Sequence, residues 1–135
     1  GNTLPKEGTV FISVNDKDKP HIKNFAKKLL DLGFSLLATN STAEILNSEN
    51  ITCKKINKAT QGSPHVVEYL DDKKISIVIN TTSGKKSIED SKSLRRSALN
   101  NGIPYFTTLA GAIACTEAII SMKNKKMGVM PIQDL

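Results

Sequence analysis

Short apolar runs alternate along the chain with longer segments in which apolar residues recur every three or four positions. Runs of β-branched, aliphatic and aromatic residues of strand length predict five strands. We place these strands at residues 10–14, 34–38, 53–56, 75–79 and 105–107. Apolar residues at helical spacing predict five helices. Four of them span residues 20–30, 66–70, 88–101 and 109–121, and the other follows residue 42 and includes residues 45 and 46. Gly33 and Gly102 follow two of these helices as stop signals.

The alternation of strands and helices predicts the fold class. Parallel strands joined by right-handed helical crossovers form a sheet that helices cover on both faces. We therefore expect an α/β protein with three layers, α/β/α, around a five-stranded, mainly parallel sheet of Rossmann-like type. In such sheets ligands bind beyond the carboxyl ends of the strands, where loops and helix N-termini present unpaired backbone N–H groups.

The composition constrains the class and compartment of the protein. With 135 residues, 39% of them hydrophobic and 24% charged, the chain is long enough for one domain with a hydrophobic core. No apolar run approaches the roughly 18 residues of a membrane span, and the first eight residues lack a secretory pattern. We expect a soluble, cytoplasmic protein. Cys53 and Cys115 stand far apart with no metal ligand nearby, so we expect them to fill the core.

The formal net charge of +6 raises the question of nucleic-acid binding. Only Arg95 and Arg96 are arginines, and the lysines are spread along the chain. The sequence has neither a basic run nor interleaved aromatic residues that could stack on bases. Charge alone therefore supports a nucleic-acid interface poorly, although it suits a small anion such as a nucleotide phosphate.

The residues that follow the predicted strands are uniform in kind: hydroxyls, an amide and ammonium groups, with no carboxylate among them. They are Ser13 and Lys19 after the first strand, Thr39 and Thr42 after the second, Lys58 after the third, and Asn80, Thr81 and Thr82 after the fourth. These groups donate hydrogen bonds and carry positive charge, which predicts an anion site with a phosphate monoester as its natural ligand. Any one Ser or Thr more often caps a helix or shapes a turn. The convergence at four strand ends favours the site.

The same loops carry little that could catalyse a reaction. Neither histidine has a Ser or Cys partner in its sequence context, and no pair of acids suggests a general acid and base. His65, just after Pro64, is interpreted as a polar contact at a helix start. Glu89 and Asp90 open a helix, where the helix dipole favours negative charge. We predict no catalytic residue and no metal site.

Nine segments, in this order and spacing, resemble a known family. They are Ile12-Ser13-Val14, Leu29-Leu30 to Gly33-Phe34, Ala38-Thr39-Asn40-Ser41-Thr42, Asn57-Lys58, Gly62-Ser63-Pro64-His65, Ile79-Asn80-Thr81-Thr82-Ser83-Gly84, Ile88-Glu89-Asp90-Ser91, Arg95-Arg96-Ser97-Ala98-Leu99 and Thr107-Thr108-Leu109. Together they are similar to the C-terminal regulatory domain of bacterial carbamoyl-phosphate synthase large chains, which is one of the methylglyoxal-synthase-like domains. The resemblance runs from about Gly8 to the end of the chain.

The resemblance implies a fragment of a larger enzyme, because the first residue is not Met. We expect residues 1–8 to be a cloning remnant or linker and residues 9–135 to form the regulatory domain. The implied parent enzyme makes carbamoyl phosphate from bicarbonate, glutamine and ATP, with Mg or Mn, for pyrimidine and arginine biosynthesis. This domain would hold no cofactor. Its implied partners are uridine and inosine monophosphates, ornithine, the rest of the large chain and the glutaminase small subunit, with no nucleic acid and no membrane.

The resemblance also assigns roles to single residues. It places the phosphate on Lys19, Thr39, Thr42 and Lys58, with Ser13 beside them, and the nucleoside against Asn80, Thr81 and Thr82. Candidates for contacts with a second effector or with the domain junction are Asp90, Thr107 and Thr108. Two positions depart from the family pattern. Ser41 stands where relatives usually have Gly, so a Cβ there limits how closely the backbone approaches phosphate, and Phe106 replaces an acid of some ornithine-responsive relatives.

Two enzymes of the same fold and a nucleic-acid-binding module are the alternatives. Methylglyoxal synthase needs a catalytic aspartate and a histidine ahead of the Arg-rich helix, but residues 51–67 contain no acid and residues 88–90 no histidine. The inosine-monophosphate cyclohydrolase domain opens with a segment like residues 13–17, but the Lys-Thr-Leu-His-Pro segment expected of it is missing. The nucleic-acid module rests on charge alone.

Overall fold

The computed structural model describes residues 5, 7–82 and 88–126. All five expected strands are present: β1 (Thr9–Ser13), β2 (Ser35–Ala38), β3 (Lys54–Lys55), β4 (Ile77–Asn80) and β5 (Tyr105–Phe106). The expected helices alternate with them: α1 (Lys23–Asp31), α2 (Asn40–Ser48), α3 (Val66–Asp71), α4 (Ile88–Asn100) and α5 (Leu109–Lys126). Two short 3₁₀ helices, η1 (Lys19–His21) and η2 (Ala59–Gln61), precede α1 and α3. Residues 83 and 84 of the turn expected after β4 lie outside the described residues.

The sheet is parallel throughout, in the order β3-β2-β1-β4-β5. The chain builds outward from β1 through β2 to β3, then returns to the other side of β1 to add β4 and β5. The strand order thus reverses between β1 and β4, and a doubly wound sheet opens a crevice at the carboxyl ends of such a pair. Ser13 lies beside Asn80, and Ile12 beside Ala38, in the register. The polar residues that end these strands therefore meet at one edge.

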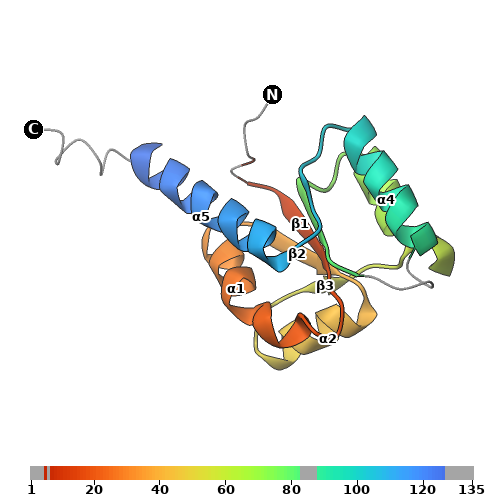
Figure 1. Ribbon diagram of the computed structural model, residues 1–135, viewed down its shortest axis with the longest axis horizontal. Coiled ribbons are helices and arrows are strands. Elements are labelled where there is room, and N and C mark those ends of the chain that lie inside the picture. The colour runs from red at the N-terminus through yellow and green to blue at the C-terminus, as the bar shows by residue number, and fades with distance from the viewer. Residues whose placement is uncertain (1–4, 6, 83–87, 127–135) are drawn as a thin grey trace, which may run out of the picture.

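Helices cover both faces of the sheet, as Figure 1 shows. On one face α1, α2 and α5 pack over strand residues that include Val10 and Ile12. On the other face α3 and α4 pack over residues that include Phe11 and Val78. Successive side chains of a strand point to opposite faces, so the unbroken apolar run of β1 supplies both cores. This confirms the predicted three-layer α/β/α fold with its five-stranded sheet.

The elements differ from expectation mainly at their ends. β3 is reduced to two exposed lysines, because it is an edge strand that pairs on one side only and charged residues suit such an edge. β4 begins at Ile77, although Ile75 before it is also buried. α5 continues to Lys126, past the expected end at residue 121, since no Gly or Pro interrupts this stretch. Neither α5 nor any other helix within the described residues is long and apolar enough to cross a membrane.

Gly33 ends α1 as predicted. Its φ of 101° lies in the left-handed region that glycine adopts without strain. The backbone N–H groups of Gly33 and Phe34 donate to the carbonyl oxygens of Leu30 and Leu29, at 2.9 and 3.1 Å. This Schellman arrangement satisfies the carbonyls at the helix end and turns the chain into β2.

Cys53 and Cys115 are unpaired and buried in the core beneath α1, α2 and α5. This confirms their expected role as core residues. Burial raises the pKa of the Cys53 thiol to about 11 and raises the pKa of the Cys115 thiol as well. Both thiols therefore stay protonated at neutral pH.

Gly8, just before β1, closely approaches Ser76, just before β4, and this contact gives a test of how tightly the chain packs there. A Cβ on Gly8 would lie 2.0 Å from the Ser76 Oγ, and the φ of Gly8 is 122°. We expect Gly8→Ala to lower the free energy of unfolding by more than Gly33→Ala. The latter imposes backbone strain on the order of 1–3 kcal/mol but meets no atom within 4 Å. Urea titration measures both. Adding Ser76→Ala should recover part of the Gly8→Ala loss, and equal losses for the two glycine variants would contradict the contact.

Candidate functional site

A cavity of about 260 Å³ opens beyond the carboxyl ends of β1 and β2. We call it the outer cavity. Five of the eight residues predicted for the anion site line it: Ser13, Lys19, Thr39, Lys58 and Thr82. They lie at or after the carboxyl ends of four different strands, so the fold brings together residues that are up to 69 positions apart in the sequence (13 to 82).

A smaller, adjoining cavity of about 20 Å³ lies deeper, between the sheet and the first turns of α4. This inner cavity shares Ser13, Thr39, Lys58 and Thr82 with the outer one. Its own polar lining is Asn80, Asp90 and Ser91, and its apolar lining is Phe11, Val66 and Leu94. Its volume suits one oxygen-sized group.

The start of α2 faces the outer cavity without a side-chain cap. Thr39 is the N-cap residue and has the extended backbone of one, but its hydroxyl makes no capping hydrogen bond. Instead the Thr39 Oγ1 lies 3.2 Å from the Ser13 Oγ, in a buried contact between the end of β1 and the start of α2. The first N–H groups of a helix have no partner within the helix. Those of α2 therefore remain available to an anion, which the helix dipole also favours.

The two lysines of the site differ in their surroundings. Lys19, in η1, has a side chain only 15% exposed, and its ammonium group forms an ion pair with the 95% exposed Asp16. The hydrogen bond and positive charge of Lys19 lower the pKa of the Asp16 carboxyl. Within the described residues, the Lys58 ammonium has no carboxylate within ion-pair distance. Lys58 is thus the cation of the site that needs no exchange of partners to meet an anion.

Two predicted residues, Thr42 and Thr81, line neither cavity. The Thr42 hydroxyl is buried and accepts from the backbone N–H of Val14 at 3.5 Å. The Thr81 hydroxyl accepts from the backbone N–H of Asn15 at 3.2 Å, while the Asn15 side-chain amide donates to the Thr81 carbonyl at 2.9 Å. Both threonines hold the loop after β1 in place, and their contacts with phosphate or nucleoside stay predictions.

The candidates for a second effector lie on different elements, Asp90 on α4 and Thr107 and Thr108 between β5 and α5. Asp90 lines the inner cavity, and its carboxylate accepts from the backbone N–H and the hydroxyl of Thr60, at 3.2 and 2.9 Å. This anchors η2, and with it the loop that carries Lys58, to α4. Thr107 and Thr108 are exposed, and the Thr108 hydroxyl accepts from the backbone N–H of Gly111 in the first turn of α5. Their role in a second site stays a prediction.

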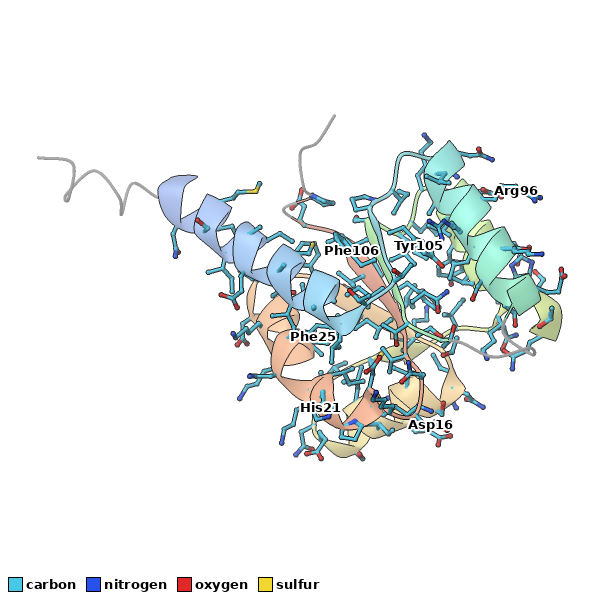
Figure 2. All side chains as sticks on the ribbon, in the orientation of Figure 1. Asp16, His21, Phe25, Arg96, Tyr105 and Phe106 are labelled. Carbon is cyan, nitrogen blue, oxygen red and sulfur yellow. The ribbon has the colours of Figure 1, made fainter. Side chains whose placement is uncertain are left out.

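The two departures from the family pattern occupy different layers. Ser41 lies in the first turn of α2 and lines the outer cavity. Its side chain adds a hydroxyl close to the N–H groups that face the cavity. Phe106 of β5 packs against the core beneath α1, α2 and α5. Figure 2 shows Phe106 and its neighbour Tyr105 on opposite sides of the sheet, with Tyr105 toward α4.

His65 caps α3, which confirms its interpretation as a helix-start contact. The Glu68 carboxylate accepts from the His65 backbone N–H at 2.8 Å, and the His65 Nδ1 accepts from the Glu68 backbone N–H at 3.3 Å. The His65 N–H, together with the Ser63 hydroxyl, lowers the pKa of Glu68. This reciprocal capping box gives the His65 imidazole a structural role at the start of α3. Among the described residues, no three His, Cys, Asp or Glu side chains gather as a metal site requires.

Three polar residues that line the cavities were given no role in the site by the sequence analysis: Asn15, Asp16 and Ser91. Asn15 and Asp16 belong to the loop after β1, which was interpreted as a polar turn. Ser91 lies on α4, where nothing in the local sequence distinguishes an inward-facing hydroxyl from an exposed one. Figure 2 shows Asp16 beyond β1, on the side of the molecule where α2 lies.

The family model of the MGS-like domain matches residues 21–107 of the chain.

The curated relatives of the chain are much longer than the chain itself. The carbamoyl phosphate synthase large chain of Mesorhizobium japonicum is 44% identical over 134 residues, which are 99% of this chain and 12% of that protein. A protein of Methanopyrus kandleri described as "carbamoyl phosphate synthase large chain, C-terminal section" is 43% identical over 136 residues, 100% of this chain and 25% of that protein.

A solved structure shares the fold. The crystal structure of methylglyoxal synthase from Elizabethkingia anophelis superposes with a TM-score of 0.66, covering 84% of this chain and 79% of that one, at 18% sequence identity. At this identity the likeness concerns the architecture alone. The chain therefore shares its fold with an enzyme, while its sequence is similar to one section of much longer proteins.

Removing the Lys58 charge tests the anion site. We expect inorganic phosphate to raise the thermal unfolding midpoint of the chain, because a ligand that binds only the folded state stabilises it. Lys58→Gln should weaken phosphate binding about ten- to a hundredfold, the equivalent of a hydrogen bond to a charged group.

Lys55→Gln is the matched control, because it removes the same charge from an exposed position three residues away that lines neither cavity. Equal loss of binding in both variants would show that net charge, rather than the cavity, attracts the anion.

Proposed function

The chain belongs to the MGS-like domain family, and on that premise we propose that it is a regulatory domain that binds nucleoside monophosphates of the uridine and inosine type. The observation that carries this proposal is the outer cavity at the start of α2. There a helix N-terminus without a side-chain cap faces Lys19 and Lys58. Backbone N–H groups at a helix start together with ammonium groups are a common way to bind a phosphate monoester.

The dimensions of the two cavities support a mononucleotide. The outer cavity of about 260 Å³ has room for a phosphate and an attached sugar, whereas a bare phosphate would leave much of it to water. The inner cavity continues from it past Thr39 and Thr82 toward α4. We propose that the phosphate sits at the start of α2 and that the nucleoside extends toward Asn80 and Thr82.

The carboxylates of the cavities favour binding without chemistry. Asp16 is paired with Lys19, and Asp90 accepts hydrogen bonds from both the backbone N–H and the hydroxyl of Thr60. A general base must reach the proton that it removes, and both carboxylates are engaged in contacts that shape the loops. We therefore propose that the domain itself is not catalytic. Methylglyoxal synthase shares the fold, so its activity is the alternative that an assay must test.

The longer relatives suggest a setting for this domain. We propose that it is the C-terminal regulatory section of a carbamoyl-phosphate synthase large chain, with effects on pyrimidine and arginine biosynthesis. The rest of that chain and the glutaminase small subunit would then be its partners, in the cytoplasm, and ornithine a further effector. The ATP and the Mg or Mn of the parent reaction would bind outside these 135 residues.

Calorimetric titration of nucleotides tests the proposed function. Uridine or inosine monophosphate should bind at least tenfold more tightly than inorganic phosphate, because the nucleoside adds contacts along the cavity floor. Uridine, which lacks the phosphate, should bind weakly. Affinities for both monophosphates no higher than for inorganic phosphate would remove the proposal. Turnover of dihydroxyacetone phosphate by the chain would replace it with methylglyoxal synthesis.

The Asp16 carboxylate gives a second test, in which a variant binds better. Asp16 pairs with Lys19 at the mouth of the cavity, so an incoming phosphate competes with a carboxylate for the same ammonium group and is repelled by its charge. Asp16→Asn should therefore tighten uridine monophosphate binding a few-fold, with a smaller gain at high salt because screening already weakens the repulsion. Asp18→Asn changes the charge equally on the same loop, outside the cavity lining. It should leave the affinity almost unchanged, and weaker binding by Asp16→Asn would contradict this account of Lys19.

A further inference from the structure

A groove of about 620 Å³ runs between α1 and α5, which lie next to each other on one face of the sheet (Figure 1). Its apolar lining comes from three elements: Pro20 of η1, Phe25 of α1 and Ile113 of α5. Phe25 is 2% exposed and belongs to the core, whereas Ile113 is 43% exposed. Figure 2 shows Phe25 on α1, close to the start of α5. A core residue and an exposed apolar residue thus border the same groove.

The outer face of α5 continues this apolar surface. Residues 109–122 of the helix include a single charged side chain, that of Glu117. The inner face, which includes Cys115 and Ile119, is buried, and the outer face exposes three alanines beside Ile113, namely Ala110, Ala114 and Ala118. A surface helix normally has a polar outer face, and a helix that is apolar on all sides is normally buried. The pattern of α5 is therefore that of a helix that a further element covers.

Positive charge lines the α1 side of the groove. Three lysines of α1 contribute to the lining: Lys23, Lys27 and Lys28. Glu117 is the one carboxylate among the lining residues, and the other polar ones, His21 and Asn24, carry no negative charge. Three ammonium groups thus stand against one carboxylate beside an apolar floor. An occupant with an apolar side and carboxylates along its edge complements this groove.

All three lysines are available to an incoming carboxylate. Lys27 is exposed, and among the residues that the structure describes no carboxylate lies within ion-pair distance of it. Lys23 pairs with Glu49 at 3.0 Å and Lys28 with Glu117 at 2.9 Å, but these four side chains are 44–60% exposed. Exposed ion pairs contribute little to stability, so an exchange of partners costs little.

We propose that the groove and the outer face of α5 are a docking surface for an acidic amphipathic helix of a protein partner. The apolar side of that helix lies against Ile113 and the neighbouring alanines, and its carboxylates meet the lysines of α1. An amphipathic helix in a groove is a recurring mode of recognition. The inference goes beyond the proposed function, because the groove shares no lining residue with the outer or the inner cavity.

The charges and the extent of the surface favour this occupant over two others. A second copy of the chain, related by a twofold axis, would bring the same patch of both copies together and so place lysines of α1 against lysines of α1. A small organic anion would fill the groove but leave the outer face of α5 beyond it uncovered. A helix with acidic residues along one edge matches both parts of the surface.

The probe for this surface is an acidic helical peptide as long as α5, about 18 residues or roughly 27 Å. Leucines at every third or fourth position form its apolar side, and glutamates flank them. A twin peptide carries lysine in place of every glutamate. Calorimetry on the 135-residue chain, at about 0.15 M salt to screen distant charges, should show that the glutamate peptide binds at least tenfold more tightly than its twin. Absence of measurable binding by the glutamate peptide overturns the proposal.

Ile113→Glu tests the apolar part of the surface, and Leu99→Glu is its matched control. Leu99 of α4 is also an exposed large apolar residue, 69% exposed and next to Arg95 and Arg96 in the sequence, but it lines neither the groove nor the two cavities. Ile113→Glu should weaken the glutamate peptide at least tenfold, as expected for a central apolar contact. Leu99→Glu should change its affinity less than about twofold. Equal affinities of the two variants overturn the proposal.

Lys27→Glu tests the charged part, with Lys92→Glu as control. Lys92 is exposed on α4 and lines none of these cavities, so the two substitutions change the net charge equally. Lys27→Glu should weaken the glutamate peptide about two- to fivefold, as expected for one exposed charge pair, and should strengthen the lysine twin. An equal effect of Lys92→Glu would show that net charge, rather than the groove, attracts the peptide, and overturns the proposal.

Two further measurements address the other occupants and the relation to the proposed function. A dimer in sedimentation that Ile113→Glu abolishes, or binding to phosphatidylserine vesicles that it abolishes, replaces the proposal if the glutamate peptide does not bind. Ile113→Glu and Lys27→Glu should bind uridine monophosphate as the unaltered chain does. A chain that binds the peptide at this groove but no nucleotide supports the docking surface and removes the proposed function, and the reverse result does the opposite.

Discussion

The arrangement of the site depends on one constraint, the burial of β1 between two parallel neighbours and two layers of helices. A parallel sheet brings the carboxyl ends of its strands to one edge, and at that edge three strands change from apolar to polar: Ile12 to Ser13, Ala38 to Thr39 and Ile79 to Asn80. Buried polar groups are costly unless they are hydrogen-bonded. Here they bond to one another, and no buried side-chain nitrogen or oxygen in the described residues lacks a partner.

That mutual satisfaction also leaves the start of α2 open at this edge. A threonine before a helix usually caps it, and capping would consume the N–H groups that an anion needs. The contact of Thr39 with Ser13 diverts the hydroxyl to the neighbouring strand and leaves the start of α2 to an external partner. Asn80 shows the same mutual satisfaction. Its side-chain amide is fully hydrogen-bonded within the protein, and two of its partners, Ser91 and Thr82, line the inner cavity.

How far the sequence predicts this site depends on how local each determinant is. The strands and the polar residues at their ends were predictable, because a change from apolar runs to Ser, Thr or Asn is visible within a few residues. The roles of Thr42 and Thr81 were less predictable, because their hydroxyls accept from backbone N–H groups of the loop after β1, which are 28 and 66 residues away in the chain. Ser91 was missed because it is one polar residue among several on α4, and only the crossover that packs this helix over β4 turns it toward the cavity.

Helices of different layers bound the two cavities, α2 the outer one and α4 the inner one. Under the proposed function this separates the effect of phosphate from the effect of a nucleotide. The outer cavity, where we propose that phosphate binds, is bounded by α2 and the loop after β1, which pack with the core beneath α1, α2 and α5. The inner cavity is bounded by α4, which packs with the opposite core and carries the contacts of Asp90 with Thr60 and of Arg95 with Tyr105. A ligand shifts a conformational equilibrium only by its difference in affinity for the two states. A ligand confined to the outer cavity makes no contact with α4 and gains nothing from a particular position of that helix. A ribonucleotide that spans both cavities does contact α4, so its affinity depends on the position of that helix. Under the proposed function, a regulatory signal therefore begins at α4 and at the neighbouring strand β5.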